Sequence, residues 1–374
     1  MAVENSLPVA LWAIPVPEFG GVARHATDVA RAGLPGYELK VLVADGALAN
    51  TLDELGNSAI RGEFGTSAGF TKSFHILNQQ IEQLRPAVVH SHLAYADIVA
   101  CAVVVSRRLR RIVQRETFVP ALFTTEHGIA GNDAVYHSST LKARGRELIH
   151  RARLMLTNHA IAVSQSTEDQ MKRKWGARNV EVIFNGVDAP QTAMNQSRVT
   201  SKNPHILSLA RLAPEKGLEV LIEAFAELRK ELGGATLEIA GEGSELARLE
   251  ALAARLGISD AVRFPGFVDA SEAMSRADVL VQLSVWENLS YTLLDAKALG
   301  LKIVATDVGG NAEILDESEL VPSLAEIGHK NLRQTVVERI KQQLNEPGHK
   351  SFEWLNSTEM ASKIAESYRK EKQK

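Results

Sequence analysis

Short runs of aliphatic and β-branched residues alternate with segments of helical period along almost the whole chain. In the first half these runs are LPVALWAIP, ELKVLVA, AVVHSH, LFTTEH, AIAVSQ and VEVIFN, and in the second half they are HILSLAR, TLEIAGEG, AVRFPGFV, VLVQLS and KIVATDV. This alternation is typical of parallel β-sheets with helices on both faces, because neighbouring parallel strands need a long crossover connection. We therefore predict an α/β chain of two doubly wound, Rossmann-like domains that face each other across a cleft.

A polar, turn-rich stretch at residues 188–204 interrupts the pattern and predicts the linker between the domains. The first domain is expected at residues 1–190 and the second at 200–345. The tail at residues 352–374 has a helical pattern and is expected to pack back on the first domain. Its apolar residues include Phe352, Trp354, Leu355 and Met360.

The composition supports two hydrophobic cores, and it narrows both the class of protein and its cellular compartment. The 374 residues are 45% hydrophobic and 23% charged, which excludes disordered and collagen-like chains. The single cysteine, Cys101, excludes an internal disulfide and fits a reducing compartment. Glu4 precedes the first apolar run where a signal peptide has positive charge, and the longest apolar run, Ile98–Val105, is shorter than the roughly 20 residues of a membrane span. We expect a cytoplasmic protein.

Two cations stand in a turn after the strand HILSLAR, namely Arg211 and Lys216. Ligands of doubly wound sheets bind beyond the carboxyl ends of the strands. A turn at that place can aim both cations, and the start of the next helix, at a diphosphate. A solvated basic loop is the alternative. The next strand ends in the tight turn Gly241-Glu242-Gly243, which permits close approach of a ligand to the backbone.

Two carboxylates follow the strand VLVQLS. Glu287 precedes the predicted helix, where a carboxylate can also serve as a simple cap. Asp295 lies inside that helix between apolar neighbours, and aspartate is a poor residue for a helix interior. A functional interpretation is therefore stronger for Asp295 than for Glu287 when each is considered alone.

Taken together, these segments resemble the retaining glycosyltransferases of family 4, which have the two-domain GT-B fold. The resemblance rests on the Gly20-Gly21 turn, IFNGVD at 183–188, ARLAPEKG at 210–217, AGEG at 240–243, Glu287, Asp295 and TDVGG at 306–310. It implies that Arg211 and Lys216 hold the donor diphosphate and that Glu287 faces the donor sugar. It further implies that Asp295 holds the ribose hydroxyls and that His127 contacts the donor sugar.

The resemblance also implies two wider sets of binding residues. Those expected to bind the donor are Gly21, Gly241, Gly243, Gly266, Val268, Asn288, Leu289, Ser290 and Asp295. Those expected to bind the acceptor are Gly20, Arg24, His25 and His92. The chain departs from the family pattern at Asp295, where glutamate is usual, and at Asn288 and Ser290, where glycines are common.

The histidines of the first half raise the question of a metal. His90 and His92 point to the same side of a strand, but a metal site would need further ligands. The chain has no Asp-x-Asp motif. We therefore expect no metal and no cofactor apart from the nucleotide sugar itself.

Two arginine-rich stretches, Arg107–Arg115 and Arg144–Arg153, are interleaved with leucine, isoleucine and valine. They fit either an anionic membrane surface or a solvated basic face. Nucleic acid is not expected, since no nucleic-acid-binding motif accompanies the charge. The arginines are Arg107, Arg108, Arg110, Arg111 and Arg115 in the first stretch, and Arg144, Arg146, Arg151 and Arg153 in the second.

The function implied by the resemblance is metal-independent transfer of a hexosyl group, with retention, from a UDP- or GDP-sugar. The expected acceptor is a glycan or a lipid-linked molecule of cell-envelope polysaccharide or glycolipid synthesis, which suits a protein at the inner face of the cell membrane. Two alternatives remain open. One is a UDP-sugar 2-epimerase of the same architecture, and the other is a non-catalytic protein that binds nucleotide sugars or a membrane surface.

Overall fold

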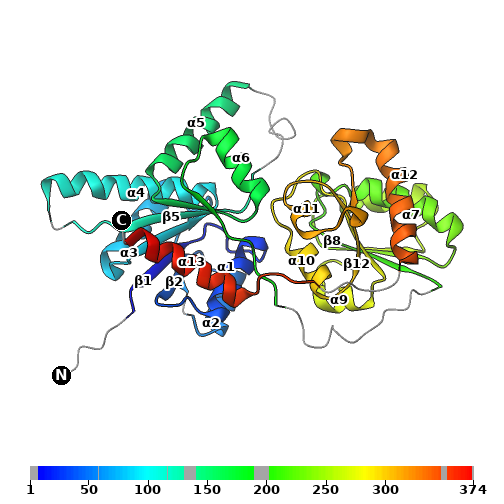
Figure 1. Cartoon of the computed structure of the whole chain (residues 1–374), viewed down its shortest axis with the longest axis horizontal. Helices are drawn as coiled ribbons and strands as arrows, with labels where there is room; N and C mark the ends of the chain where they lie inside the picture. The colour runs from blue at the N-terminus through cyan, green and yellow to red at the C-terminus, as the bar shows by residue number, and fades with distance from the viewer. Residues whose placement is uncertain are drawn as a thin grey trace. The chain divides into compact units, whose positions relative to one another are not determined.

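The computed structural model describes residues 7–57, 59–115, 117–129, 140–188, 202–346 and 352–372. The side chains of residues 140–144 and 146, and most of the predicted linker, lie outside the described part. The chain divides into two compact units, Met1–Gly186 together with Leu355–Lys374, and Val187–Trp354 (Figure 1).

The first unit is built on a seven-stranded parallel sheet with the order β3-β2-β1-β4-β5-β6-β7. The order reverses between β1 and β4, which is where doubly wound sheets bind ligands. The strands are β1 (Val9–Ala13), β2 (Glu38–Val43), β3 (Ile60–Arg61), β4 (Val88–His92), β5 (Ala121–Glu126), β6 (His159–Ala162) and β7 (Val180–Val182). The helices are α1 (Gly21–Ala32), α2 (Ala47–Glu54), α3 (Phe70–Leu84), α4 (Ala94–Val113), α5 (Thr140–Leu156) and α6 (Gln165–Trp175).

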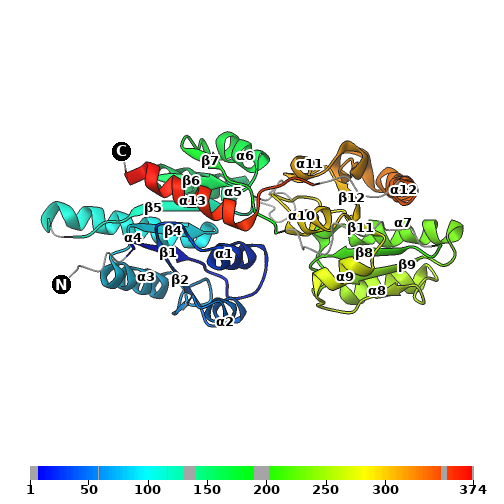
Figure 2. The ribbon, with the colours of Figure 1, turned by 60° about the horizontal axis from the view of Figure 1, so that its bottom comes forward.

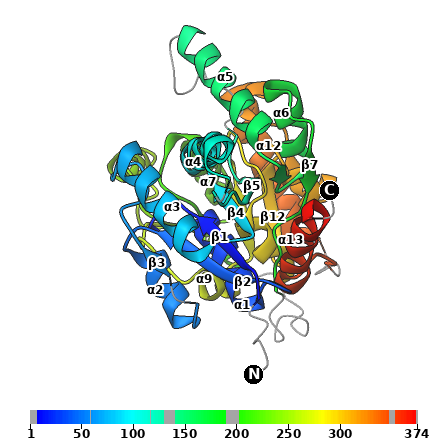
Figure 3. The same cartoon turned by 90° about the vertical axis from the view of Figure 1, so that its left-hand side faces the viewer.

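Side chains of β1 alternate between two cores, one on each face of this sheet. Trp12 packs in the core that α1 lines, and Leu11 packs in the core lined by α3 and α4. Figure 3 shows α3 and the C-terminal helix α13 (Ser357–Lys372) on opposite sides of β1 and β4. This arrangement confirms the doubly wound fold predicted for the first half of the chain.

The C-terminal helix α13 returns to the first unit and packs beside α1 (Figure 2), as the sequence predicted. Met360, Ile364 and Tyr368 are fully buried there. The helix begins later than the apolar pattern indicated, however, because Asn356 and Glu359 form reciprocal side-chain-to-backbone hydrogen bonds of 2.9 Å that fix its start. Phe352 and Trp354 precede the helix and stack on each other in the second unit.

The second unit has a six-stranded parallel sheet with the order β10-β9-β8-β11-β12-β13, so its order reverses between β8 and β11. The strands are β8 (His205–Leu209), β9 (Thr236–Ala240), β10 (Val262–Arg263), β11 (Val279–Gln282), β12 (Lys302–Thr306) and β13 (Leu320–Val321). The helices are α7 (Leu218–Glu231), α8 (Leu246–Arg255), α9 (Ala270–Arg276), α10 (Tyr291–Ala298), α11 (Asn311–Ile314) and α12 (Leu324–Asn345), and short 3-10 turns lie at Pro214–Lys216 and Glu317–Glu319.

This second sheet confirms the other doubly wound domain. Its two reversal strands, β8 and β11, carry the loops with the predicted cations and with Glu287. Within the described ranges, none of the helices combines the length and the apolar character that crossing a membrane requires.

Candidate active site

Lys216 and Glu287 come together at the carboxyl edge of the second sheet. The Nζ atom of Lys216 lies 2.5 Å from Oε1 of Glu287, and the hydroxyl of Ser284 donates to the same oxygen over 2.8 Å. Lys216 ends the 3-10 turn after β8, while Ser284 and Glu287 follow β11, so the reversal of strand order brings them side by side. The Glu287 carboxylate is thus held by one cation and one hydroxyl.

The helix that follows Glu287 is capped by another residue. Ser290 is the N-cap of α10, and its hydroxyl accepts a hydrogen bond from the backbone N–H of Leu293. The capping interpretation of Glu287 is therefore wrong, because Ser290 occupies the cap and Glu287 binds Lys216 instead. A serine suits this position, since an N-cap favours a short side chain with an oxygen acceptor.

Arg211 lies in the same loop but is held differently. Its guanidinium pairs over 2.5 Å with Glu215, whose side chain is buried, while the Arg211 side chain is 69% exposed. The backbone carbonyl of Glu215 accepts a hydrogen bond of 2.8 Å from Val285 N, which ties the cation loop to the loop after β11. Arg211 is therefore an exposed cation on a fixed loop, available to an anion in solution.

The glycines of the turn after β9 keep this loop close to the neighbouring one. A Cβ atom on Gly241 would lie 2.0 Å from the carbonyl oxygen of Ala210, and one on Gly243 would lie 2.2 Å from that of Leu212. Larger residues at either position would push away the loop that carries Arg211. Packing between the loops is thus sufficient to explain both glycines.

The other predicted donor residues of the second unit lie in the loops after β10 and β11 and in α10. Asn288 and Leu289 are buried, and the Asn288 carbonyl accepts from Gly310 N over 2.8 Å. Gly266 accepts a hydrogen bond of 2.7 Å from Gly241 N, and Val268 is half-buried two residues later. Asp295 lies on α10 and is half-buried, between the buried residues Leu294 and Ala296 as predicted.

In the first unit, the Gly20-Gly21 turn follows β1 and begins helix α1. Gly20 is the N-cap and provides no side-chain hydrogen bond to the helix start. A Cβ atom there would meet nothing within 4 Å, so packing does not explain this glycine and the backbone at the helix start is open to a ligand. Arg24 on the first turn is half-buried and lies 3.2 Å from Asp28.

Three of the predicted histidines form one cluster at the carboxyl edge of the first sheet. His92 Nδ1 lies 2.9 Å from His127 Nε2, and His25 Nδ1 lies 3.1 Å from Asn185 Oδ1. The ring of His25 is 4.8 Å from that of His127 and 5.7 Å from that of His92. The sequence gave one signal for them, which is their position near strand ends and helix starts: His92 ends β4, His127 follows β5 and His25 lies near the start of α1.

Burial keeps these three rings neutral. It lowers the pKa of His25 to about 4, against the opposing effect of the Asn185 hydrogen bond. Burial and the neighbouring histidines lower the pKa values of His92 and His127 well below the usual value. His90 stacks on His92 with ring centroids 4.5 Å apart, but both of its nitrogens bond to other residues, namely Tyr368 and Thr125.

The two family models that match the chain cover it from residue 19 to residue 366. Glycosyl transferases group 1 matches residues 191–366, and Glycosyltransferase Family 4 matches residues 19–190. The chain belongs to glycosyltransferase family 4. Each half of the chain matches a family model separately. The family assignment therefore applies to both units.

Curated relatives of this family 4 protein are matched over part of their length. Glycogen synthase of Mycobacterium tuberculosis is 30% identical over 193 residues, which are 50% of this chain and 47% of that protein. The GDP-mannose-dependent alpha-(1-6)-phosphatidylinositol monomannoside mannosyltransferase of the same organism is 28% identical over 225 residues, or 53% of this chain and 58% of that protein. The chain thus spans about half the length of these relatives.

Solved structures resemble the family 4 protein over nearly its full length. HepE of Anabaena, crystallised with UDP, has a TM-score of 0.68 at 19% identity and covers 98% of this chain and 97% of its own. Sucrose-phosphate synthase of Thermosynechococcus elongatus has a TM-score of 0.68 at 17% identity, over 97% and 98% of the two chains. At these identities the likeness concerns the fold, and it confirms the GT-B architecture.

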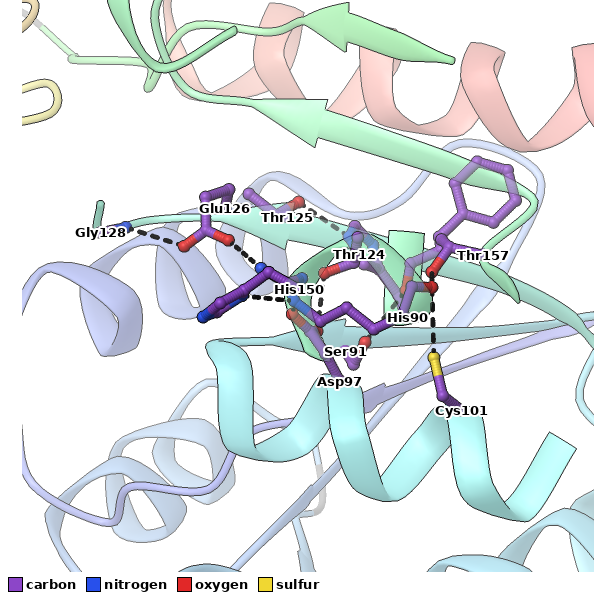
Figure 4. A network of polar contacts seen from close by, with 12 residues as sticks. His90, Ser91, Asp97, Cys101, Thr124, Thr125, Glu126, Gly128, His150 and Thr157 are labelled. Carbon is purple, nitrogen blue, oxygen red and sulfur yellow. Dashed lines mark hydrogen bonds and ion pairs between the residues drawn. The ribbon is translucent and has the colours of Figure 1, made fainter. Parts of the chain in front are cut away.

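A buried ionic network lies at the end of β5 in this family 4 protein, next in the chain to His127 (Figure 4). Arg153 of α5 binds Asp97 of α4 and, over 2.5 Å, Glu126 at the end of β5, and all three side chains are 2% exposed. Burial raises the pKa values of both carboxyls, and the charge of Arg153 opposes that rise. Glu126 also accepts a hydrogen bond from the backbone N–H of Gly128. The network therefore holds the chain on both sides of His127.

Two arginines of the stretches predicted to face either a membrane or solvent are buried instead, and for them both alternatives were wrong. Arg153 neutralises the two interior carboxylates, and Arg107 donates to the Phe118 carbonyl, to Asn78 and to Glu82 over 2.6 to 2.9 Å. An arginine with that many acceptors can be buried without an unpaired charge. The side chains of Arg144 and Arg146 lie outside the described residues.

Proposed function

We propose that this protein transfers a hexosyl group from a UDP- or GDP-sugar to a glycan or lipid-linked acceptor, with retention of the anomeric configuration. The observation that carries the proposal is the contact between Lys216 and Glu287, with Arg211 on the same loop, at the carboxyl edge of the second sheet. The solved relative HepE, whose crystals contained UDP, supports a nucleotide donor.

The two cations have different parts in this mechanism. Negative charge grows on the leaving diphosphate as the bond to the sugar breaks, and the sugar gains oxocarbenium character. Lys216 stabilises that charge from a fixed position, because Glu287 and the fold hold its ammonium in place. Arg211, exposed and forked, binds the phosphate oxygens from the solvent side. With these cations and the start of a helix available, the proposed reaction needs no metal.

The acidic residues orient the sugar and the nucleoside. Glu287, fixed by Lys216 and Ser284, is proposed to accept hydrogen bonds from donor-sugar hydroxyls. Asp295 is proposed to bind the ribose, and its side chain is one methylene shorter than the usual glutamate. We assign no protein base, since an oxygen of the leaving phosphate takes the proton of the acceptor in the family mechanism.

In the first unit, His127 is proposed to contact the donor sugar. Gly20 and Arg24 are proposed to receive the acceptor together with His25 and His92. The open backbone at Gly20 supports this assignment, because packing within the protein does not require glycine there.

An apolar and basic surface at the end of α4 suits a lipid-linked acceptor. Leu109, Ile112 and Val113 are 60%, 78% and 85% exposed, and Arg110 and Arg111 are exposed beside them. We name these five residues the α4-end patch. Apolar side chains that enter the interface and cations that meet anionic headgroups are the two elements of peripheral membrane binding. We propose that the patch rests on an anionic membrane surface.

A ligand panel followed by product analysis tests the function. The purified chain is mixed with UDP, GDP, ADP and their sugars, and unfolding is followed on heating. A ligand present at 100 times its dissociation constant stabilises the fold by about 2.7 kcal/mol. The donor identified in this way is then incubated with candidate acceptors. Conversion of the donor sugar without an acceptor would favour the epimerase, and binding without any turnover would favour a binding protein.

A further inference from the structure

Three imidazole rings from distant parts of the chain converge in the first unit. His25 comes from α1, His92 ends β4 and His127 follows β5. One ring nitrogen of each lies within 4.8 Å of those of the other two. Neutral imidazole is the most common metal ligand among protein side chains, and zinc is regularly bound through its nitrogens.

The hydrogen bond of His25 decides which of its nitrogens is free. Asn185 Oδ1 can only accept, so the Nδ1 atom of His25 carries the proton and its Nε2 presents a lone pair. That Nε2 atom is buried and has no hydrogen-bond partner among the described residues. A ligand histidine whose other nitrogen donates to an oxygen is the usual arrangement around a protein-bound metal.

His92 offers a second free nitrogen. Its Nε2 atom is also buried and without a partner among the described residues, while its Nδ1 shares one proton with His127 Nε2. With His92 as the donor of that hydrogen bond, its Nε2 presents a lone pair like that of His25, and the lone pair of His127 Nε2 becomes available to an ion when this hydrogen bond breaks. Two buried lone pairs without donors are unfavourable, and a cation would satisfy both.

The surroundings suit a bound ion. Trp12 lies against both buried rings, with centroids 5.7 Å from His25 and 4.4 Å from His92, and limits the access of water. His127 is only half-buried and provides an entry path. Zinc–nitrogen bonds of about 2.0–2.1 Å place tetrahedral ligands roughly 3.3–3.4 Å apart, so binding would draw the three rings closer together.

We propose that His25, His92 and His127 bind one zinc ion, and that the bound ion inhibits sugar transfer. Three histidines leave a fourth position open to water or to a substrate oxygen. Inhibition rests on the proposed function, because the ion would bind a nitrogen of His127, the residue proposed to contact the donor sugar. Binding of the ion does not depend on that function.

The chain has a second group with ligand atoms, and it serves as the control. Glu219, Glu223 and His329 also lie within 4.8 Å of one another, but Arg248 pairs with Glu219 and Arg333 pairs with Glu223. These carboxylates are more exposed and already neutralised by arginine, so they compete poorly for a cation. His329→Gln removes the only imidazole of this second group.

Zinc binding is measured on the full chain by competition with a chromophoric chelator. The unmodified chain should hold one tight equivalent that His25→Gln and His127→Gln lose and that His329→Gln retains. Asn185→Ala should weaken zinc affinity about 10- to 100-fold, as expected when the outer partner of a ligand histidine is lost. If the His25 variant does not fold, the half-exposed His127 still provides the test. Equal zinc affinity in the His127→Gln and unmodified chains would overturn the site.

The inhibitory role has a separate readout. Added zinc should slow transfer and a chelator should restore it, and Asn185→Ala should shift the inhibiting concentration upward by the same factor as its affinity. A chain that binds zinc as proposed but shows no transfer would refute the proposed function and leave the site standing. Transfer that continues at full rate with the site saturated would refute inhibition.

Discussion

Lys216 and Glu287 form an ion pair in which Nζ and Oε1 are 2.5 Å apart, and this pair joins the loops after the two reversal strands of the second sheet. The lysine side chain is 22% exposed and the glutamate 15%, so both are partly shielded from water yet reachable by a ligand. A diphosphate that approaches Lys216 therefore meets a cation already oriented by the protein, with little reorganisation left for the reaction step.

Removal of either cation should slow the reaction without unfolding the protein. For Lys216→Ala and Arg211→Ala we expect kcat to fall by about 10²- to 10³-fold, the usual cost of losing one group that stabilises developing charge. Steady-state kinetics with the identified donor measures this, and Arg229→Ala, which breaks an ion pair with Asp260, is the control. A normal kcat in the Lys216 variant would contradict the mechanism.

Glu287→Gln should separate the two roles of this carboxylate. The amide keeps the size of the side chain and can accept the hydrogen bond from Ser284, but it no longer neutralises Lys216. We expect kcat to fall while the affinity for the free nucleoside diphosphate is kept or rises, because Lys216 loses its competing anion. Calorimetry and a double-mutant cycle with Lys216→Met measure the coupling, expected at about 0.5–3 kcal/mol. Independent, additive effects would argue against the pair.

Arg153→Met should destabilise the first unit strongly. The change leaves Asp97 and Glu126 buried without their shared cation, and breaking a buried ion pair costs about 3–5 kcal/mol. Urea unfolding measures the loss, and Arg151→Met, which breaks an exposed pair with Glu147, should cost about 0–1 kcal/mol. Adding Glu126→Gln to Arg153→Met should recover part of the stability. A cost near that of the Arg151 variant would show that the network is not needed.

Chelating agents should not reduce transfer. In the proposed mechanism, Arg211 and Lys216 stabilise the negative charge of the leaving diphosphate. A divalent ion is therefore not required. Activity is measured after dialysis against EDTA and again with added Mg²⁺. A strict requirement for Mg²⁺ would refute the metal-independent mechanism, and it would leave the inhibitory zinc site untouched.

Neutralising the α4-end patch should weaken binding to anionic vesicles. Each basic residue near an anionic surface contributes about 1 kcal/mol, so Arg110→Gln with Arg111→Gln should lower the partition coefficient by about 30-fold. Sedimentation with phosphatidylserine vesicles measures it. Arg263→Gln, exposed on β10 of the other unit, is the control, and an equal effect of both would refute a specific surface.

The sequence by itself determined the two doubly wound sheets, the strand ends that carry Arg211, Lys216, Glu287 and His92, and the returning C-terminal helix. These features depend on local periodicity and on the rule that ligands bind at carboxyl strand ends, and both are readable along the chain. The apolar pattern missed the two-residue strands β3 and β13, and it placed the start of α13 too early because the reciprocal Asn356–Glu359 cap outweighed it.

Only the tertiary structure decided how side chains from distant segments combine. It buried Arg107 and Arg153, paired Glu287 with Lys216 and made Ser290 the helix cap. It also brought His25, His92 and His127 into one cluster. The physical reason is that burial and pairing depend on the order of strands in the sheet. In the sequence, an arginine within a helical segment looks the same whether its partner is water, a lipid headgroup or a pair of carboxylates like those that hold Arg153.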